Sequence, residues 1–191
     1  EAARVTGVKR VVFSSSSSIY GGQVEFPTKE SDKPMTEYNP QSPYAQFKVI
    51  GEHYCKMYSK LFEVDTVCLR YFNIYGPRQR HDSPYAAVIA AFMNCAINDE
   101  TPTIHGDGGQ FRDFTYVANA VNANILAATH PEPLLGESFN VGTGAKISVN
   151  EIHAASGAPK AVYVPSRSGD VRGSQASIEK IHKAVGYKAL V

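Results

Sequence analysis

The pattern of apolar and polar positions predicts strands and helices in turn along the chain. An apolar run at 8–13 predicts a buried strand that leads directly into five consecutive serines at 14–18. A second strand is predicted at 64–71, where apolar side chains alternate with other residue types. Between the two strands, apolar residues at helical spacing predict a helix over 42–61, with serine and proline at its start. Strand, helix and strand in this order indicate a parallel sheet in an α/β protein.

The same pattern predicts the elements that follow. Helices are expected at 85–97 and 117–129, from about 149 and at about 177–185; strands are expected at 103–105, 111–116, 138–141 and 161–164. In the helix at 117–129, Val121, Ile125 and Leu126 are expected on the buried side. Residues 1–6 resemble the last turns of a helix closed by Gly7, so we expect that the natural protein has residues upstream.

A tyrosine and a lysine at the start of the helix predicted over 42–61 are the first candidates for chemistry. Tyr44 and Lys48 are four residues apart, so both side chains point from one face of the helix. A neighbouring ammonium lowers the pKa of a phenol. The serine run would leave the end of a buried strand, where open α/β sheets usually place their chemistry. Together these features suggest a proton-transfer site.

Each feature also has an ordinary structural explanation. Roughly 0.6 Tyr-x-x-x-Lys pairs are expected by chance in such a chain, so the pair at 44 and 48 is equally compatible with a surface helix. The serine run is compatible with a flexible linker, although linkers rarely lie between two apolar segments. Arg112 with Asp113 is compatible with an ordinary ion pair under a turn, and Arg167 with Asp170 and Arg172 is compatible with a solvated loop. The long polar segment at 21–40, with three prolines, is expected to be an irregular and functional loop.

Composition narrows the function classes. The chain has 191 residues, 43% of them hydrophobic, which suits one sizeable core with or without a smaller lobe. A net charge of +1 with interspersed acids and bases argues against a nucleic-acid partner. Three cysteines without a C-x-x-C pattern favour free thiols in the cytoplasm, and the lack of a long apolar run or signal-like start argues against a membrane location. The histidines are scattered without the spacing of metal ligands, which argues against a metal site. The chain also lacks a G-x-S-x-G motif, which argues against a Ser-His-Asp hydrolase.

Seven short motifs occur in a fixed order along almost the whole chain. They are VKRVVFSSS at 8–16, IYG at 19–21, SPY with a lysine at 42–48, LRYFNIYGPR at 69–78, GDG and RDF within 106–114, FNVGTG at 139–144 and GDVR at 169–172. In this order they resemble the extended short-chain dehydrogenase/reductases and, more narrowly, the NAD-dependent nucleotide-sugar epimerase/dehydratase family. Nothing in the chain matches the G-x-x-G-x-x-G turn with which members of that family begin.

The resemblance implies an α/β fold with the C-terminal portion of a Rossmann-type parallel sheet plus a smaller α/β substrate-binding lobe. Residues 1–76 would be the C-terminal part of the NAD-binding domain, and 77–191 mainly the nucleotide-sugar-binding lobe, with about 112–144 returning to the first domain. The chain by itself is expected to be inactive, because part of the NAD site would lie outside it. The resemblance also implies a homodimer through the helix from Tyr44 to Leu61.

The resemblance assigns roles to the residues that match the motifs. Tyr44 would be the catalytic base and acid, Lys48 would hold the nicotinamide ribose, and Ser16 would relay the proton between the sugar O4 and Tyr44. The further residues expected to contact NAD are Ser14, Ser15, Tyr71 and Phe72. Those expected to contact the UDP-sugar, besides Ser16, are Ser17, Ser18, Asn73, Ser174, the arginines Arg112 and Arg167 as a diphosphate clamp, and Asp170 on the ribose hydroxyls.

Two positions discriminate among the activities of the family. Sugar dehydratases carry Asp-Glu directly after the catalytic residue and UDP-glucuronate decarboxylases carry a Glu two residues after it, whereas this chain has Ser17 and Ser18. Without that general acid, we expect 4-epimerisation of a UDP-hexose through a transient 4-keto sugar. Ser174 replaces a bulky tyrosine of some members and leaves room for a 2-acetamido group. This favours UDP-GlcNAc and UDP-GalNAc, with UDP-glucose and UDP-galactose as second candidates.

Two alternatives remain open from the sequence. The first is another activity of the same family, namely a decarboxylase or epimerase acting on a UDP-uronic acid, or a sugar dehydratase. The second is a non-catalytic fragment that binds a nucleotide sugar.

Overall fold

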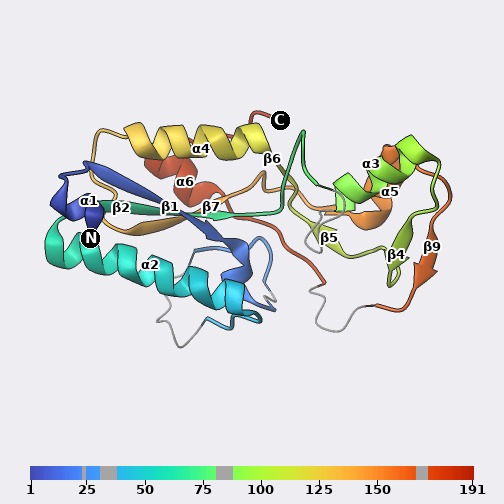
Figure 1. Ribbon diagram of the computed structural model, residues 1–191, viewed down its shortest axis with the longest axis horizontal. Coiled ribbons are helices and arrows are strands. Elements are labelled where there is room, and N and C mark those ends of the chain that lie inside the picture. Colours follow the sequence, from blue (N-terminus) through green and yellow to red (C-terminus); the bar gives the residue numbers. More distant parts are fainter. Residues whose placement is uncertain (23–24, 31–37, 81–87, 167–171) are drawn as a thin grey trace.

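The computed structural model describes residues 1–22, 25–30, 38–80, 88–166 and 172–191, which form a larger and a smaller part (Figure 1). The larger part is built on a parallel sheet in the order β1-β2-β7, which comprises β1 (Arg10–Ser16), β2 (Asp65–Tyr71) and β7 (Glu137–Val141). Helix α2 (Pro43–Phe62) covers one face of this sheet; α4 (Val117–Thr129) and α6 (Glu179–Val185) cover the other (Figure 1). The predicted parallel sheet is therefore confirmed.

The smaller part contains short strands and two helices. Its elements are α3 (Val88–Asn98), β4 (Thr103–His105), α5 (Val149–Ser156) and β9 (Val162–Val164), with β4 and β9 parallel. Short strand pairs lie between the two parts: β3 (Ile74–Tyr75) with β6 (Thr115–Tyr116), and β5 (Phe111–Arg112) with β8 (Ile147–Ser148). The chain starts with the short helix α1 (Ala2–Val5). None of the helices in the described ranges is both long and apolar enough to cross a bilayer.

Helix α2 begins as its sequence predicts. The Ser42 side chain accepts a hydrogen bond from the Ala45 amide, and proline occupies the first helical position. Gly51 lies directly against the ring of Phe13 on β1, where any Cβ would overlap the ring. The glycine therefore lets the helix approach the first strand closely, which fixes the height of its side chains above the sheet.

The first strand differs from its prediction at both ends. It begins at Arg10 and continues through Ser14, Ser15 and Ser16, whose backbone pairs with Leu69–Tyr71 of β2. Backbone pairing does not depend on side-chain polarity, so the ladder extends as far as its partner strand does. The last two serines begin the 3-10 helix η1 (Ser17–Tyr20). Three of the five serines thus belong to the strand and two to the 3-10 helix. The prediction that the whole run follows the strand was wrong.

The predicted buried face of α4 is wrong in part. Val121 and Ile125 are 52% and 57% exposed, whereas the buried positions are Asn119, Ala120, Ala123 and Ala127. Alanines allow the helix to lie close on the sheet, and the Asn119 side chain bonds to the backbone of the chain's last two residues. Leu126 does pack against the core, as predicted.

The core of the larger part includes the last helix of the chain. Val67 and Leu69 of β2 pack with Ala123 of α4 and with Ile181 and Tyr187 at the C-terminal end. The domain division expected from the sequence assigned the region of α6 to the smaller lobe, but this helix packs with the larger part. A separate small core in the other part contains Phe92, Ile104, Val149 and Ala161.

Candidate active site

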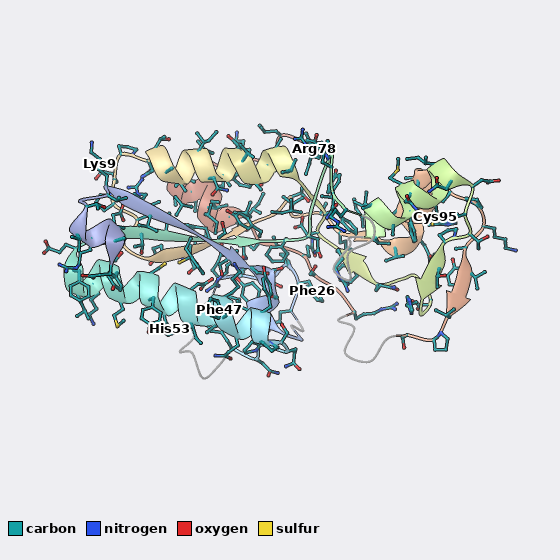
Figure 2. The ribbon with its side chains drawn as sticks, in the orientation of Figure 1. Lys9, Phe26, Phe47, His53, Arg78 and Cys95 are labelled. Atoms are coloured by element: carbon teal, nitrogen blue, oxygen red, sulfur yellow. The ribbon has the colours of Figure 1, made fainter. Side chains whose placement is uncertain are left out.

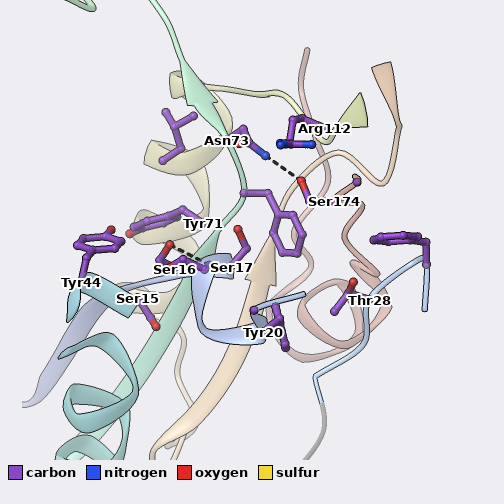
Figure 3. Close-up of a pocket in the computed structure, with 16 residues that line it drawn as sticks. Ser15, Ser16, Ser17, Tyr20, Thr28, Tyr44, Tyr71, Asn73, Arg112 and Ser174 are labelled. Carbon is purple, nitrogen blue, oxygen red and sulfur yellow. Dashed lines mark hydrogen bonds between the residues drawn. The ribbon is translucent and has the colours of Figure 1, made fainter. Parts of the chain in front are cut away.

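A cavity of about 1080 Å3 opens where β1 and β2 end (Figure 3). Carboxyl ends of parallel strands are the usual binding edge of an open α/β sheet, because the chain leaves the sheet there and loops converge. The lining residues are Ser15, Ser16, Ser17, Ser18, Tyr20, Gly21, Phe26, Thr28, Tyr44, Tyr71, Phe72, Asn73, Ile74, Arg112, Gly173 and Ser174. This lining contains most of the site residues predicted from the sequence. Arg167 and Asp170 lie outside the described residues.

Tyr44 and Lys48 lie in the first two turns of α2. The Tyr44 ring is 56% exposed and lines the cavity. The Lys48 ammonium lies 5.4 Å from the centre of that ring and donates a 2.7 Å hydrogen bond to the carbonyl of Ser14. A positive charge is therefore held beside the phenol by the strand that carries the serines. Ser14 and Lys48 are not in the cavity lining itself but lie next to it.

The serines at the end of β1 alternate in direction. Ser15 is buried, and its hydroxyl donates to the Glu52 carboxylate of α2. Ser14 and Ser16 are two positions apart and hence on the other face of the strand. The Ser16 hydroxyl lines the cavity and accepts a 3.2 Å hydrogen bond from the Ser18 amide, which caps η1 (Figure 3). Among the described residues, the buried Ser18 hydroxyl has no hydrogen-bond partner.

The opposite wall of the cavity carries Asn73 and Ser174 (Figure 3). The Asn73 amide donates a 3.0 Å hydrogen bond to the Ser174 hydroxyl. Arg112 lies close by in the same lining, so one of the two arginines expected to bind a diphosphate is at the cavity.

The buried Asp113 carboxylate fixes the segments that carry Arg112 and Ser174. It accepts hydrogen bonds of 2.8–3.0 Å from the amides of Thr143, Gly144 and Ala176. It also accepts one from the Thr143 hydroxyl. One carboxylate therefore joins three chain segments behind the cavity wall.

A buried polar cluster beneath the cavity was not predicted from the sequence. Glu52 of α2 and Arg70 of β2 form an ion pair of 2.7 Å, and Arg70 donates to the hydroxyl of Tyr20, which lines the cavity. Burial lowers the pKa of the Arg70 guanidinium, but its hydrogen bonds with Glu52 and its charge interactions with Tyr20, Glu52 and Tyr38 together leave the pKa above its ordinary value. Burial also raises the pKa of Tyr20. The sequence signal was an arginine in a central strand covered by helices, a position that requires a buried partner.

Phe26 and Thr28 in the cavity lining were also missed. They belong to the long loop, whose irregular sequence gives no periodic signal. Within the described residues, no group of three or more histidine, cysteine or acidic side chains is arranged to bind a metal ion.

A parallel sheet with this cavity at the carboxyl ends of its strands defines a partial Rossmann-like α/β protein. The family model described as "NAD dependent epimerase/dehydratase family" matches residues 1–142. The chain belongs to this family, as its motifs indicated.

Relatives and solved structures agree with the family. The chain is 39% identical to the UDP-glucose 4-epimerase of Mycolicibacterium smegmatis over 100% of this chain and 61% of the relative. It is 34% identical to the UDP-glucuronate 4-epimerase of Thermodesulfobacterium geofontis over 95% of this chain and 55% of the relative. It superposes with a TM-score of 0.90 and 37% identity on the UDP-N-acetylglucosamine 4-epimerase of Methanobrevibacter ruminantium in complex with UDP-N-acetylmuramic acid, covering 98% of this chain and 60% of that one. The chain thus spans about three fifths of the length of such relatives.

Proposed function

We propose that this chain carries the proton-transfer site and the nucleotide-sugar pocket of a UDP-hexose 4-epimerase. The observation that supports this most directly is the composition of the cavity. Its described lining has tyrosine and serine hydroxyls beside Lys48 and an arginine at the other end, but no carboxylate. A 4-epimerase needs one acid/base group at O4, whereas elimination of water needs a second acid/base pair.

In the proposed reaction, the Tyr44 oxygen takes the proton of the sugar O4, directly or through the Ser16 hydroxyl, and later returns it. Lys48 keeps a positive charge beside the Tyr44 ring. The sugar passes through a 4-keto form, turns over in the pocket and is reduced on the other face. Arg112 binds the diphosphate during this rotation, so the nucleotide stays fixed while the hexose moves.

NAD is the cofactor that the family uses. Two aromatic side chains at the cavity, Tyr71 and Phe72, suit a flat ring, and the Tyr71 hydroxyl is anchored by the Asn124 amide at 2.8 Å. The Lys48 ammonium and the Tyr44 hydroxyl suit the hydroxyls of a ribose. When bound, NAD supplies the acceptor and donor of the C4 hydrogen.

The substrate proposed here is UDP-GlcNAc and its epimer UDP-GalNAc, with UDP-glucose and UDP-galactose as second candidates. Ser174 is small and is bonded to Asn73, so that part of the wall leaves space for a 2-acetamido group. In the natural full-length protein, Ser174→Tyr should remove N-acetylated turnover and keep UDP-glucose turnover. The matched control Ser174→Ala loses the same hydrogen bond without adding bulk and should keep both activities. Wild-type protein that converts UDP-glucose but not UDP-GlcNAc would contradict this substrate.

Two alternative functions have specific support. The UDP-glucuronate relative favours a uronic acid substrate, which product analysis with UDP-glucuronate would detect as UDP-galacturonate or as CO2 and a pentose. The second alternative is a chain that binds UDP-sugars without turnover, for which the cavity lined by Asn73 and Arg112 is sufficient. Calorimetric titration of the 191-residue chain with UDP, and separately with NAD, tests this second alternative: binding of UDP alone supports it for the chain as given.

We also propose a homodimer through α2. Phe47, Ile50, Tyr54, Met57 and Leu61 repeat at spacings of three and four residues, and all are exposed, with Phe47 at 74%. Such a repeat is the pattern of a helix that packs against another helix. The described residues of this chain leave this row exposed, and a second copy of α2 would cover it.

A further inference from the structure

The buried ion pair under the cavity fastens the helix of Tyr44 to all three strands of the sheet. Glu52 lies one turn after Lys48 on α2, and its side chain is 7% exposed. Its carboxylate receives hydrogen bonds from Ser15 of β1, from Arg70 of β2 at 2.7 and 2.9 Å and from Ser138 of β7 at 3.1 Å. The adjacent turn of the helix is held by Lys48 on the Ser14 carbonyl. Lys48 and Glu52, one turn apart on α2, therefore bond to the successive residues Ser14 and Ser15 of β1. These contacts fix the position of the helix along the strand.

The arginine of the same pair reaches the far wall of the cavity. Arg70 donates hydrogen bonds of 2.8 Å to the hydroxyls of Tyr20 and Tyr38, and its guanidinium lies over both rings. The Tyr20 hydroxyl donates in turn to the Asn140 side chain at 2.6 Å, and Asn140 donates to the carbonyl of Thr28 at 2.9 Å. Tyr20 and Thr28 both line the cavity (Figure 3). One hydrogen-bonded chain thus joins the helix of Tyr44 to the wall on the other side.

Stability alone does not explain a charged cluster at this place. Replacing a buried ion pair by apolar residues of similar volume is often neutral or stabilising, because desolvation offsets the attraction between the charges. A planar guanidinium bonded to a carboxylate and two phenols does fix distances and angles, since each donor has one direction. The cluster lies one turn from Lys48 and directly beneath the serines.

We propose that Glu52, Arg70 and Tyr20 are positioning residues of the proton-transfer site. They fix the distance between Tyr44 and Ser16. They also fix the position of the cavity wall at Tyr20 relative to these two residues. The inference rests on the epimerase function proposed above and adds to it residues that do not touch the reacting atoms. Because proton transfer needs hydrogen-bond reach between donor and acceptor, a small shift of α2 slows the chemical step.

The test replaces the pair by apolar residues of similar size in the natural full-length protein. Glu52→Leu with Arg70→Met leaves neither charge without its partner, so the variant should fold, with a thermal midpoint lowered by the lost hydrogen bonds to Ser15, Ser138, Tyr20 and Tyr38. Its kcat should fall by about 100-fold, as expected for a displacement of about 1 Å, while the Kd for UDP stays unchanged. With a C4-deuterated substrate, the primary isotope effect on kcat should increase, since the chemical step becomes slower. A smaller fraction of folded enzyme would lower the rate without changing that isotope effect.

The sheet offers a matched control at its opposite end. Arg10 of β1 and Asp65 of β2 also form an ion pair, and they too have further hydrogen bonds to backbone groups. Arg10→Met with Asp65→Leu should lower the thermal midpoint but leave kcat and the isotope effect unchanged. Tyr20→Phe, which removes only one hydroxyl, should lower kcat by roughly 10-fold without a change in UDP binding.

Separate results would overturn separate claims. An active wild type whose Glu52→Leu/Arg70→Met variant keeps its kcat and isotope effect would overturn the positioning role, and so would a rate loss that the control pair reproduces. A wild-type protein that binds UDP and NAD but interconverts no UDP-hexose would overturn the epimerase function itself, and the positioning role with it.

Discussion

At the residue scale, the proposed chemistry depends on one phenol. Tyr44 combines exposure to the cavity, the neighbouring Lys48 ammonium and a place on the same lining as Ser16. Its motif is local in sequence, so the residues on the helix and the serine strand could be predicted before the structure. The contact between Glu52 and Arg70 could not be predicted from the sequence, because it depends on how α2 lies on the sheet.

Tyr44→Phe in the natural full-length protein should lower kcat by about 100-fold to 10,000-fold, the usual contribution of a general acid/base group. The affinity for UDP should not change, since the ring remains. Turnover of UDP-GlcNAc followed by chromatography measures the loss. The control Tyr58→Phe removes a hydroxyl from the same helix that bonds to Glu1 and should keep full activity. Equal losses in both variants would argue against a catalytic role for Tyr44.

Tyr187 gives a prediction about pH and stability. Burial, followed by the nearby Asp113 charge, raises the pKa of Tyr187 to about 12. In the unfolded chain the Tyr187 hydroxyl has the ordinary tyrosine pKa of about 10. Between this pKa and the raised pKa of the folded chain, unfolding releases a proton. The stability due to this group is therefore complete below about pH 10 and is lost as the pH rises toward 12.

Urea unfolding between about pH 9 and 11.5 measures the loss. Tyr187→Phe should show a shallower fall of the unfolding free energy with pH, although the raised pKa of Tyr20 leaves part of the slope. An identical slope in the variant would show that Tyr187 does not take part.

At the element scale, the sequence predicted the helices and strands well where their periodicity is strong. Helix α2 and strand β2 lie within a residue or two of their expected bounds. The buried face of α4 could not be predicted, because its large apolar residues face outward and its alanines face the sheet. Local pattern cannot show that close packing favours the small side chains. The serines of β1 were misassigned for a related reason, since pairing with β2 overrides their low strand tendency.

Gly51→Ala tests the close contact between α2 and β1. Alanine is normally the better helix former by about 1 kcal/mol, but here its Cβ would overlap the Phe13 ring. We expect a net loss of about 1–3 kcal/mol in unfolding free energy, as for an overpacked core. Adding Phe13→Leu should recover part of this loss. A variant at least as stable as the wild type would show that the ring moves away without cost.

At the scale of the whole molecule, the exposed apolar row on α2 predicts a dimer. Phe47→Glu with Tyr54→Glu should convert the natural full-length protein to a monomer, because two charges would be buried in the interface. Light scattering after size-exclusion chromatography measures the mass. The control Ile97→Glu changes a residue that is 78% exposed on α3, outside the row, and should leave the mass unchanged. A monomeric wild type would contradict the proposed interface.

The arrangement of the two parts was only partly predictable. The motifs implied a sheet domain, a smaller lobe and a return of the chain between them. They did not indicate that the last helix packs beside β2, because Ile181 and Tyr187 carry no motif. Nor did they reveal how Asp113 joins three segments behind the cavity, because three of its four hydrogen bonds come from backbone amides.

The proposed function is tested most directly by the reaction of the natural full-length protein with UDP-GlcNAc in D2O, followed by mass spectrometry and proton NMR. A 4-epimerase that moves the C4 hydrogen off and back gives UDP-GalNAc of unchanged mass, with no solvent deuterium at C4 or C5. The described part of the cavity lining, which contains no carboxylate, predicts this result. A product lighter by one water, or deuterium at C5, would contradict it.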